Sequence, residues 1–141
     1  MMLDFGETWL TIKALFEGNA AKLGVNLDNI VMGVPGQSLQ NEPPYIYIYL
    51  LPAKGGSNEK STTGNIKCLV FCGVHPDGNI PDGLINAHKL AGRCKKVFEK
   101  APIVGYFNDP PIDFDFISSN VVRTILSLTI KIKLDEDLID A

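Results

Sequence analysis

The N-terminal part of the chain carries a helical pattern of apolar positions. Steps of three and four residues place these side chains on one face of a helix with about 3.6 residues per turn. They are Phe5, Trp9, Ile12, Phe16, Ala20 and Leu23. Asp4 and Glu7 have the spacing of a capping box at the start of this helix, and Gly24 can end it in the left-handed conformation. Gly18 and Asn19 are expected to fray or interrupt it.

Two stretches in the middle of the chain alternate with the period of a β-strand. Residues 45–51, with the sequence YIYIYLL, place tyrosines on one face and aliphatic side chains on the other. Residues 65–74 alternate in the same way, and the segment 53–64 between them has the composition of a turn. We therefore expect a long β-hairpin whose loop projects and is mobile. A further short strand is expected at residues 29–33.

The second half of the chain predicts a helix and then strand structure. Pro81 suits the first helical position, and the helix is expected to end near Lys100. Its apolar stripe consists of Leu84, Ala87, Ala91, Cys94 and Phe98. Residues 101–111 are expected to form an irregular crossing. Residues 113–134 then predict two strands, or one bent strand, broken near residues 118–120.

This order of elements indicates the fold class. Runs of adjacent strands interrupted by two helices favour an antiparallel or mixed sheet covered by helices on one side. The chain is therefore expected to form one α+β domain over residues 1–141. The sheet should be mixed, mostly antiparallel and four- to five-stranded, with two helices packed on one face and a long β-hairpin.

Composition narrows the class of protein. The chain has 141 residues, of which 45% are hydrophobic and 21% charged, an ordinary balance for a globular domain. A net charge of −3 argues against a protein whose main role is to wrap duplex nucleic acid. Three cysteines, an odd number, favour a reducing compartment, and the first residues lack the pattern of a signal peptide. The longest apolar run, residues 45–52, is too short to span a bilayer, so a cytoplasmic protein with no membrane partner is expected.

The residues that could carry chemistry do not form a recognisable site in the sequence. Cys68 and Cys72 would lie about 13 Å apart on a strand, too far to share one zinc ion, so buried structural cysteines are expected. His88 has no nucleophile or carboxylate at an informative spacing. The Lys60-Ser61 pair lacks the preceding glycine and following helix of a phosphate-binding loop. We therefore expect no catalytic residues, no metal site and no cofactor, and a protein that is not an enzyme.

Apolar side chains on both faces of the predicted strands raise the question of what covers the second face. Tyr45, Tyr47 and Tyr49 lie opposite the aliphatic residues of their strand. The next strand similarly places Leu69 and Phe71 on its second face. Because tyrosine is enriched at protein interfaces, a neighbouring subunit is one possible cover. An ordinary second core layer within the chain is the other.

The order of five segments is similar to that of one family of virion proteins. The segments are the helix at residues 5–16, the strands YIYIYLLP and KCLVFCGV, the helix at residues 81–100 and the strand TILSLTIKIKL. In pattern and topology, over nearly the whole chain, they resemble the tail terminator (tail completion) proteins of long-tailed bacteriophages. The resemblance implies a homo-oligomer, a hexameric ring on the end of the tail tube. Its partners would be the tail tube protein and the head–tail connector, in a virion assembled in the host bacterial cytoplasm.

The resemblance also suggests roles for individual residues. The hairpin tip from Lys54 to Thr63, which includes Lys60, would make axial contact with a neighbouring ring. The tyrosines, with Leu69 and Phe71, would pack between subunits. Residues Arg123, Lys131 and Lys133 form a basic strand face that would line a channel for DNA, since phosphate attraction needs only such charge. The alternative for the basic strand face is an ordinary solvated surface. The alternatives for the role of the whole chain are another head–tail neck protein and a small α+β enzyme or ligand-binding domain.

Overall fold

The computed structural model describes residues 2–33, 42–52 and 63–134 of the chain. The helical elements are α1 (Phe5–Gly18), α2 (Ala20–Leu23), the 3-10 helix η1 (Leu27–Asn29) and α3 (Ile80–Glu99). The strands are β1 (Ile30–Gly33), β2 (Tyr45–Pro52), β3 (Thr63–Val74), β4 (Val104–Ile117) and β5 (Val122–Lys133). No helix in this described part of the chain is long and apolar enough to cross a bilayer.

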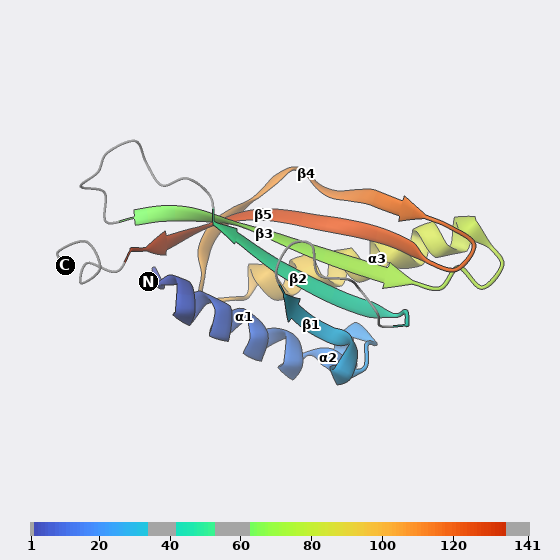
Figure 1. Cartoon of the computed structure of the whole chain (residues 1–141), viewed down its shortest axis with the longest axis horizontal. Helices are drawn as coiled ribbons and strands as arrows, with labels where there is room; N and C mark the ends of the chain where they lie inside the picture. Colours follow the sequence, from blue (N-terminus) through green and yellow to red (C-terminus); the bar gives the residue numbers. More distant parts are fainter. Residues whose placement is uncertain (1, 34–41, 53–62, 135–141) are drawn as a thin grey trace.

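The strands form one five-stranded sheet in the order β1-β2-β3-β5-β4 (Figure 1). Strands β1 and β2 are parallel, and every other neighbouring pair is antiparallel. The predicted α+β fold with a mixed, mostly antiparallel sheet is therefore confirmed. Strands β2 and β3 pair from Tyr45 opposite Gly73 to Pro52 opposite Ile66. The loop that joins them, residues 53–62 with Lys54 and Lys60, lies outside the described residues.

The first helix begins and ends as its sequence predicts. The backbone N–H of Glu7 donates to the Asp4 carboxylate at 2.8 Å, and the Glu7 carboxylate accepts from the Asp4 N–H at 3.3 Å. The helix breaks at Asn19, whose side-chain amide donates to the Leu15 carbonyl at 2.7 Å. The short helix α2 follows and ends at Gly24 with a φ of 72°, a left-handed conformation in which glycine carries no steric penalty.

The core contains side chains from α1, α3 and one face of the sheet. In β2, β3 and β5 the even-numbered residues face this core, because paired residues share a face. Helix α3 runs behind β3 and β5 in Figure 1. Ile12 and Phe16 of α1 are fully buried, and the Phe16 ring meets Phe98 of α3 edge-on at 5.2 Å between centroids. The buried Thr124 hydroxyl donates to the Ala87 carbonyl at 3.3 Å, which ties β5 to α3.

Strand β4 corrects one prediction. The sequence predicts an irregular crossing over residues 101–111, but β4 extends from Val104 to Ile117 and pairs with β5 on both sides of Pro110 and Pro111. The register shifts between Phe107 and Ile112, so the prolines occupy an irregular part of the ladder that does not use their missing N–H groups. An edge strand tolerates such an interruption. Because of these prolines, the sequence pattern predicts no strand in this part of the chain.

Candidate assembly surface

The sheet face opposite the helices carries an aromatic layer of its own. Tyr45, Tyr47 and Tyr49 lie on this face, as the alternation predicts, and are only 6%, 4% and 9% exposed. The Tyr49 ring lies 4.7 Å from Tyr47 and 5.2 Å from Phe71, centroid to centroid. Burial raises the pKa of both Tyr45 and Tyr47. These tyrosines therefore form a second packed layer rather than an exposed subunit interface, while Leu69 and Phe71 beside them are half-buried.

Arg123 lies on this face at the start of β5, close to the β4–β5 turn, and is not a free cation. Its Nε lies 3.0 Å from Asp115 Oδ1 and its Nη2 lies 2.7 Å from Asp115 Oδ2. The rings of Phe71 and Phe116 lie 5.1 and 5.7 Å from its Cζ. Burial alone would lower the pKa of Arg123, but the Asp115 carboxylate and the Tyr45 hydroxyl hold it above its ordinary value. Arg123, which was predicted to belong to a basic strand face lining a channel, is thus already paired with Asp115.

Tyr45 reaches Arg123 because a glycine lies between them in the sheet. Gly73 of β3 is the register partner of both residues. A Cβ atom on Gly73 would lie 2.6 Å from Cε2 and 2.8 Å from the hydroxyl of Tyr45. The tyrosine ring therefore occupies the space that a side chain at Gly73 would need, and the glycine is required for this close approach.

Gly73→Ala is expected to lower the free energy of unfolding by about 1–3 kcal/mol, because the added methyl displaces the Tyr45 ring from a packed layer. Urea denaturation followed by circular dichroism measures the change. Gly92→Ala in α3 is the matched control, since its Cβ would meet no atom within 4 Å. That control is expected to stabilise the helix by about 0.5–1 kcal/mol. Equal effects of the two substitutions would contradict the packing of Tyr45 on Gly73.

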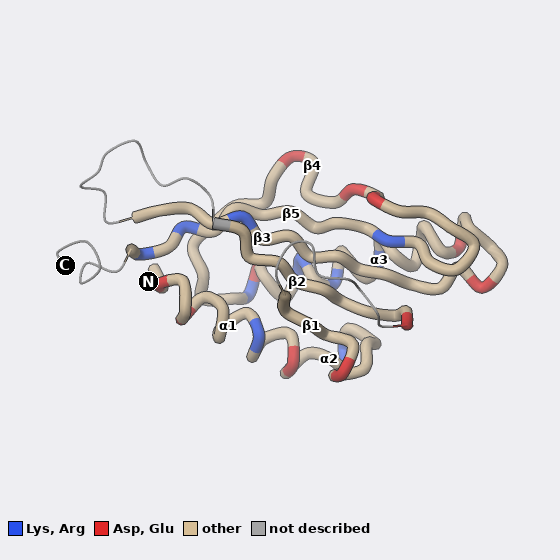
Figure 2. The backbone as a smooth tube through the Cα atoms, in the orientation of Figure 1, with Lys and Arg blue, Asp and Glu red and all other residues tan. Residues whose placement is uncertain are grey.

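The other two predicted channel residues do present their charges to solvent. Lys131 and Lys133 of β5 are exposed, and Lys67 of β3 lies on the same face opposite Thr129. Lys67 and Lys131 are thus diagonal neighbours, about 7–8 Å apart. Figure 2 shows basic positions at the end of the sheet nearest the two termini. Within residues 2–33, 42–52 and 63–134, no ion pair involves any of these three lysines.

Lys67 was not among the predicted channel residues, although its parity with Leu69 and Phe71 places it on this face. The strand alternation therefore already places Lys67 on this face. The sequence does not show that β3 pairs with β5, and this pairing is what brings Lys67 close to Lys131. We call Lys67, Lys131 and Lys133 the basic end of the sheet.

The exposed large apolar side chains of the described strands all lie on β4, which has only one neighbouring strand. Five large apolar side chains of β4 are between 38% and 57% exposed. They are Val104, Tyr106, Phe114, Phe116 and Ile117, and together we call them the β4 edge. Pro110 and Pro111 interrupt this strand, so continuous strand addition along it is disfavoured. The β4 edge is thus suited to docking through side chains.

The cysteines are placed for packing. Cys68, Cys72 and Cys94 are all free and buried, as predicted. Burial raises the pKa of Cys68, and the hydrogen bond with Cys72, helped by burial, raises the pKa of Cys94. The Cys72 and Cys94 sulfur atoms lie 3.8 Å apart and join β3 to α3. Among the described residues, no group of three potential metal ligands comes together, and His88 is exposed beside the Phe114 ring.

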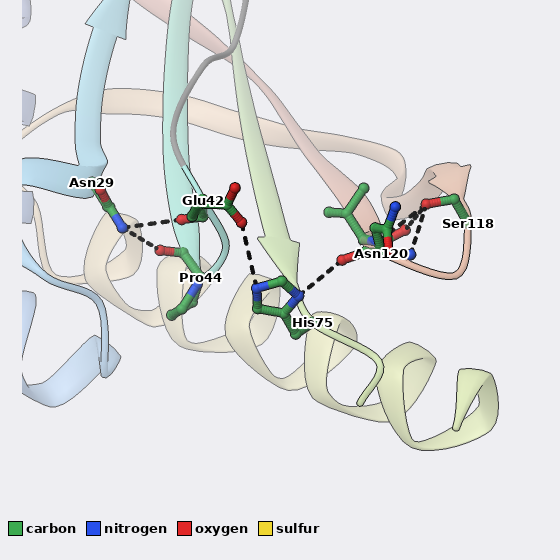
Figure 3. A network of polar contacts seen from close by, with 7 residues as sticks. Asn29, Glu42, Pro44, His75, Ser118 and Asn120 are labelled. Atoms are coloured by element: carbon green, nitrogen blue, oxygen red, sulfur yellow. Dashed lines mark hydrogen bonds and ion pairs between the residues drawn. The ribbon is translucent and has the colours of Figure 1, made fainter. Parts of the chain in front are cut away.

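A polar network lies at the end of the sheet opposite the basic end (Figure 3). His75 Nδ1 donates to the Asn120 carbonyl at 2.9 Å, and its Nε2 lies 3.8 Å from the Glu42 carboxylate. The Asn29 side chain donates to the carbonyls of Glu42 and Pro44, each at 3.1 Å. These contacts join the segment before β2 to the end of β3 and to the β4–β5 turn. The histidine is used to hold three chain segments together at the surface.

No protein-family model matches the chain, and no curated protein matches it. The features available for a functional inference are therefore the fold, the β4 edge and the distribution of charge.

Proposed function

We propose that the chain is a structural assembly protein of a long-tailed phage, a tail terminator that forms a ring on the tail tube and joins it to the head-side connector. The observation that carries the assembly role is the β4 edge, with its five exposed large apolar side chains on one edge strand. Val104 and Tyr106 lie opposite Lys131 and Thr129 near one end of β5, and Phe114, Phe116 and Ile117 lie opposite residues 122–124 near the other end, so β4 offers two groups of exposed apolar side chains. Exposed apolar groups of this kind on soluble proteins are candidate interaction sites. The order of elements, similar to that of tail terminator proteins, supports the specific role.

The position of the β4 edge supports ring formation. The strand lies at one side of the sheet and β1 at the other, so the two sides of the subunit differ. A copy that docks its β4 edge on a different patch of the next copy makes a heterologous contact, and such contacts generate rings when the rotation closes. Docking through side chains, rather than continuous strand pairing, also disfavours open-ended sheet growth.

The basic end of the sheet supports the passage of DNA through the ring. Lys67, Lys131 and Lys133 are exposed on one face, and phosphate attraction by lysine requires no base reading. Arg123 has no part in this role, because Asp115 already pairs with it. A channel lined only at one end of each subunit attracts DNA locally, which is compatible with the net charge of −3.

Deletion of this chain in the phage that encodes it tests the role. We expect tails of irregular and excessive length together with unattached heads, because nothing stops tube growth or offers a surface to the connector. Electron microscopy of lysates measures both effects, and expression of the chain in trans should reverse them. Tails of normal length with unattached heads would indicate a different neck protein. Normal particles would overturn the proposal.

A further inference from the structure

A groove between α1–α2 and α3 has an apolar floor. Its volume is about 220 Å³, and its lining residues all belong to these helices or to their caps. The floor includes Leu15 at the end of α1, Leu23 of α2 and Val97 of α3. Leu23 is buried, whereas Leu15 and Val97 are half-exposed to the groove. The groove can therefore accept apolar side chains from another segment.

The rim of this groove is strongly basic. Lys22, Arg93, Lys96 and Lys100 line it, and no lining residue is acidic. All four are exposed, and none forms an ion pair with another described residue of the chain. The C-terminus of α3 accounts for some preference for cations, but its dipole amounts to about half an elementary charge. Four cations drawn from two helices exceed what that dipole can balance.

We propose that this groove binds the acidic segment 135–140 of a second copy of the chain. The sequence of that segment is Asp135-Glu136-Asp137-Leu138-Ile139-Asp140. Its four carboxylates match the four cations of the rim, and its two adjacent aliphatic residues match the apolar floor. The segment thus complements the groove in both charge and hydrophobicity. The inference rests on the proposed function, because it requires copies of the chain to meet.

The path of the chain favours a second copy over the same copy. The Lys133 N–H donates to the Leu3 carbonyl at 2.8 Å, so β5 ends beside the start of α1. The groove begins at Leu15, about 18 Å further along at 1.5 Å per helical residue. Six extended residues span about 20 Å, so the segment of the same copy would be used up in reaching the rim. The acidic segment of a neighbouring copy can approach the groove from outside, so this limit on reach does not apply to it. The contact between the segment of one copy and the groove of the next is heterologous, as a ring requires.

A labelled peptide of residues 134–141 tests the proposal by fluorescence anisotropy against the full-length chain. We expect saturable binding that weakens with added salt. The Lys96→Glu, Lys100→Glu double variant should bind about tenfold more weakly, because two attractions become repulsions. A peptide whose acidic residues are replaced by lysine should reverse this preference and bind the double variant. Lys13→Glu, on α1 outside the groove, is the matched control and should bind as the unchanged chain does.

The outcomes separate this inference from the proposed function. Failure of the peptide to bind the unchanged chain, or equal binding to the double variant, overturns the groove assignment. A peptide that binds while its lysine-substituted counterpart binds equally well also overturns it, since the charge match would then be irrelevant. A chain that forms rings although the peptide does not bind leaves the proposed function standing. A chain that binds the peptide but never assembles would support the groove assignment and contradict the proposed ring.

Discussion

Phe16→Ala is expected to lower the free energy of unfolding by about 3–5 kcal/mol. The side chain is fully buried, and its ring meets Phe98 at 5.2 Å, so it joins α1 to α3 and to the sheet. Truncation to alanine removes these contacts and leaves a cavity that the surrounding sheet cannot fill. Urea denaturation followed by circular dichroism at 222 nm measures the loss as a lower midpoint with an unchanged slope.

Leu10→Ala in the same helix is the control for this effect. Leu10 is 66% exposed, so its truncation should change the free energy of unfolding by less than about 0.5 kcal/mol. If Phe16→Ala proves as mild as Leu10→Ala, helix α1 does not pack on the core through this face. The helix would then have to be repositioned.

The Tyr106→Asp, Ile117→Asp double variant is expected to prevent formation of the proposed ring and leave monomers. These residues are 57% and 50% exposed in the single chain, so the substitutions should leave its fold intact. In a ring they would place two carboxylates in a buried apolar contact, where each unpaired charge costs several kcal/mol. Sedimentation velocity measures the shift from ring to monomer, and circular dichroism confirms the fold.

Leu27→Asp in η1 is the matched control for the β4 edge. Leu27 has a similar exposure of 52% but lies in η1 beside β2, away from β4 in the sheet order, so this variant should still assemble. A double variant that forms rings as readily as the unchanged chain would show that the β4 edge is not the interface. Dissociation by Leu27→Asp as well would indicate a general loss of solubility instead.

Local sequence patterns predicted most of the individual elements. The Asp4–Glu7 spacing, the break at Asn19 and the left-handed Gly24 all appear in the structure as the sequence indicates. These features depend on residues within one or two helical turns of each other. The strand alternation at residues 45–51 likewise identifies the two faces of β2. It does not identify what lies on the second face, which depends on packing.

The features that sequence reasoning missed depend on contacts between distant segments. The Arg123–Asp115 pair requires the β4–β5 register, and the first half of β4, up to its two prolines, was predicted as an irregular crossing. The basic end of the sheet became complete only when β3 placed Lys67 beside β5. The basic groove joins α1–α2 to α3 across about 70 residues of sequence, with no local pattern that marks it. Tertiary packing creates each of these features.

Mass and shape of the purified chain in solution test the proposed ring most directly. We expect mass photometry to show a species at an integer multiple of 15.4 kDa as concentration rises, a hexamer if the chain assembles as tail terminators do. Negative-stain electron microscopy of the same sample should show closed rings with a central opening. A single 15.4 kDa species at every concentration, with no ring in the micrographs even when tail tubes are added, would contradict ring formation.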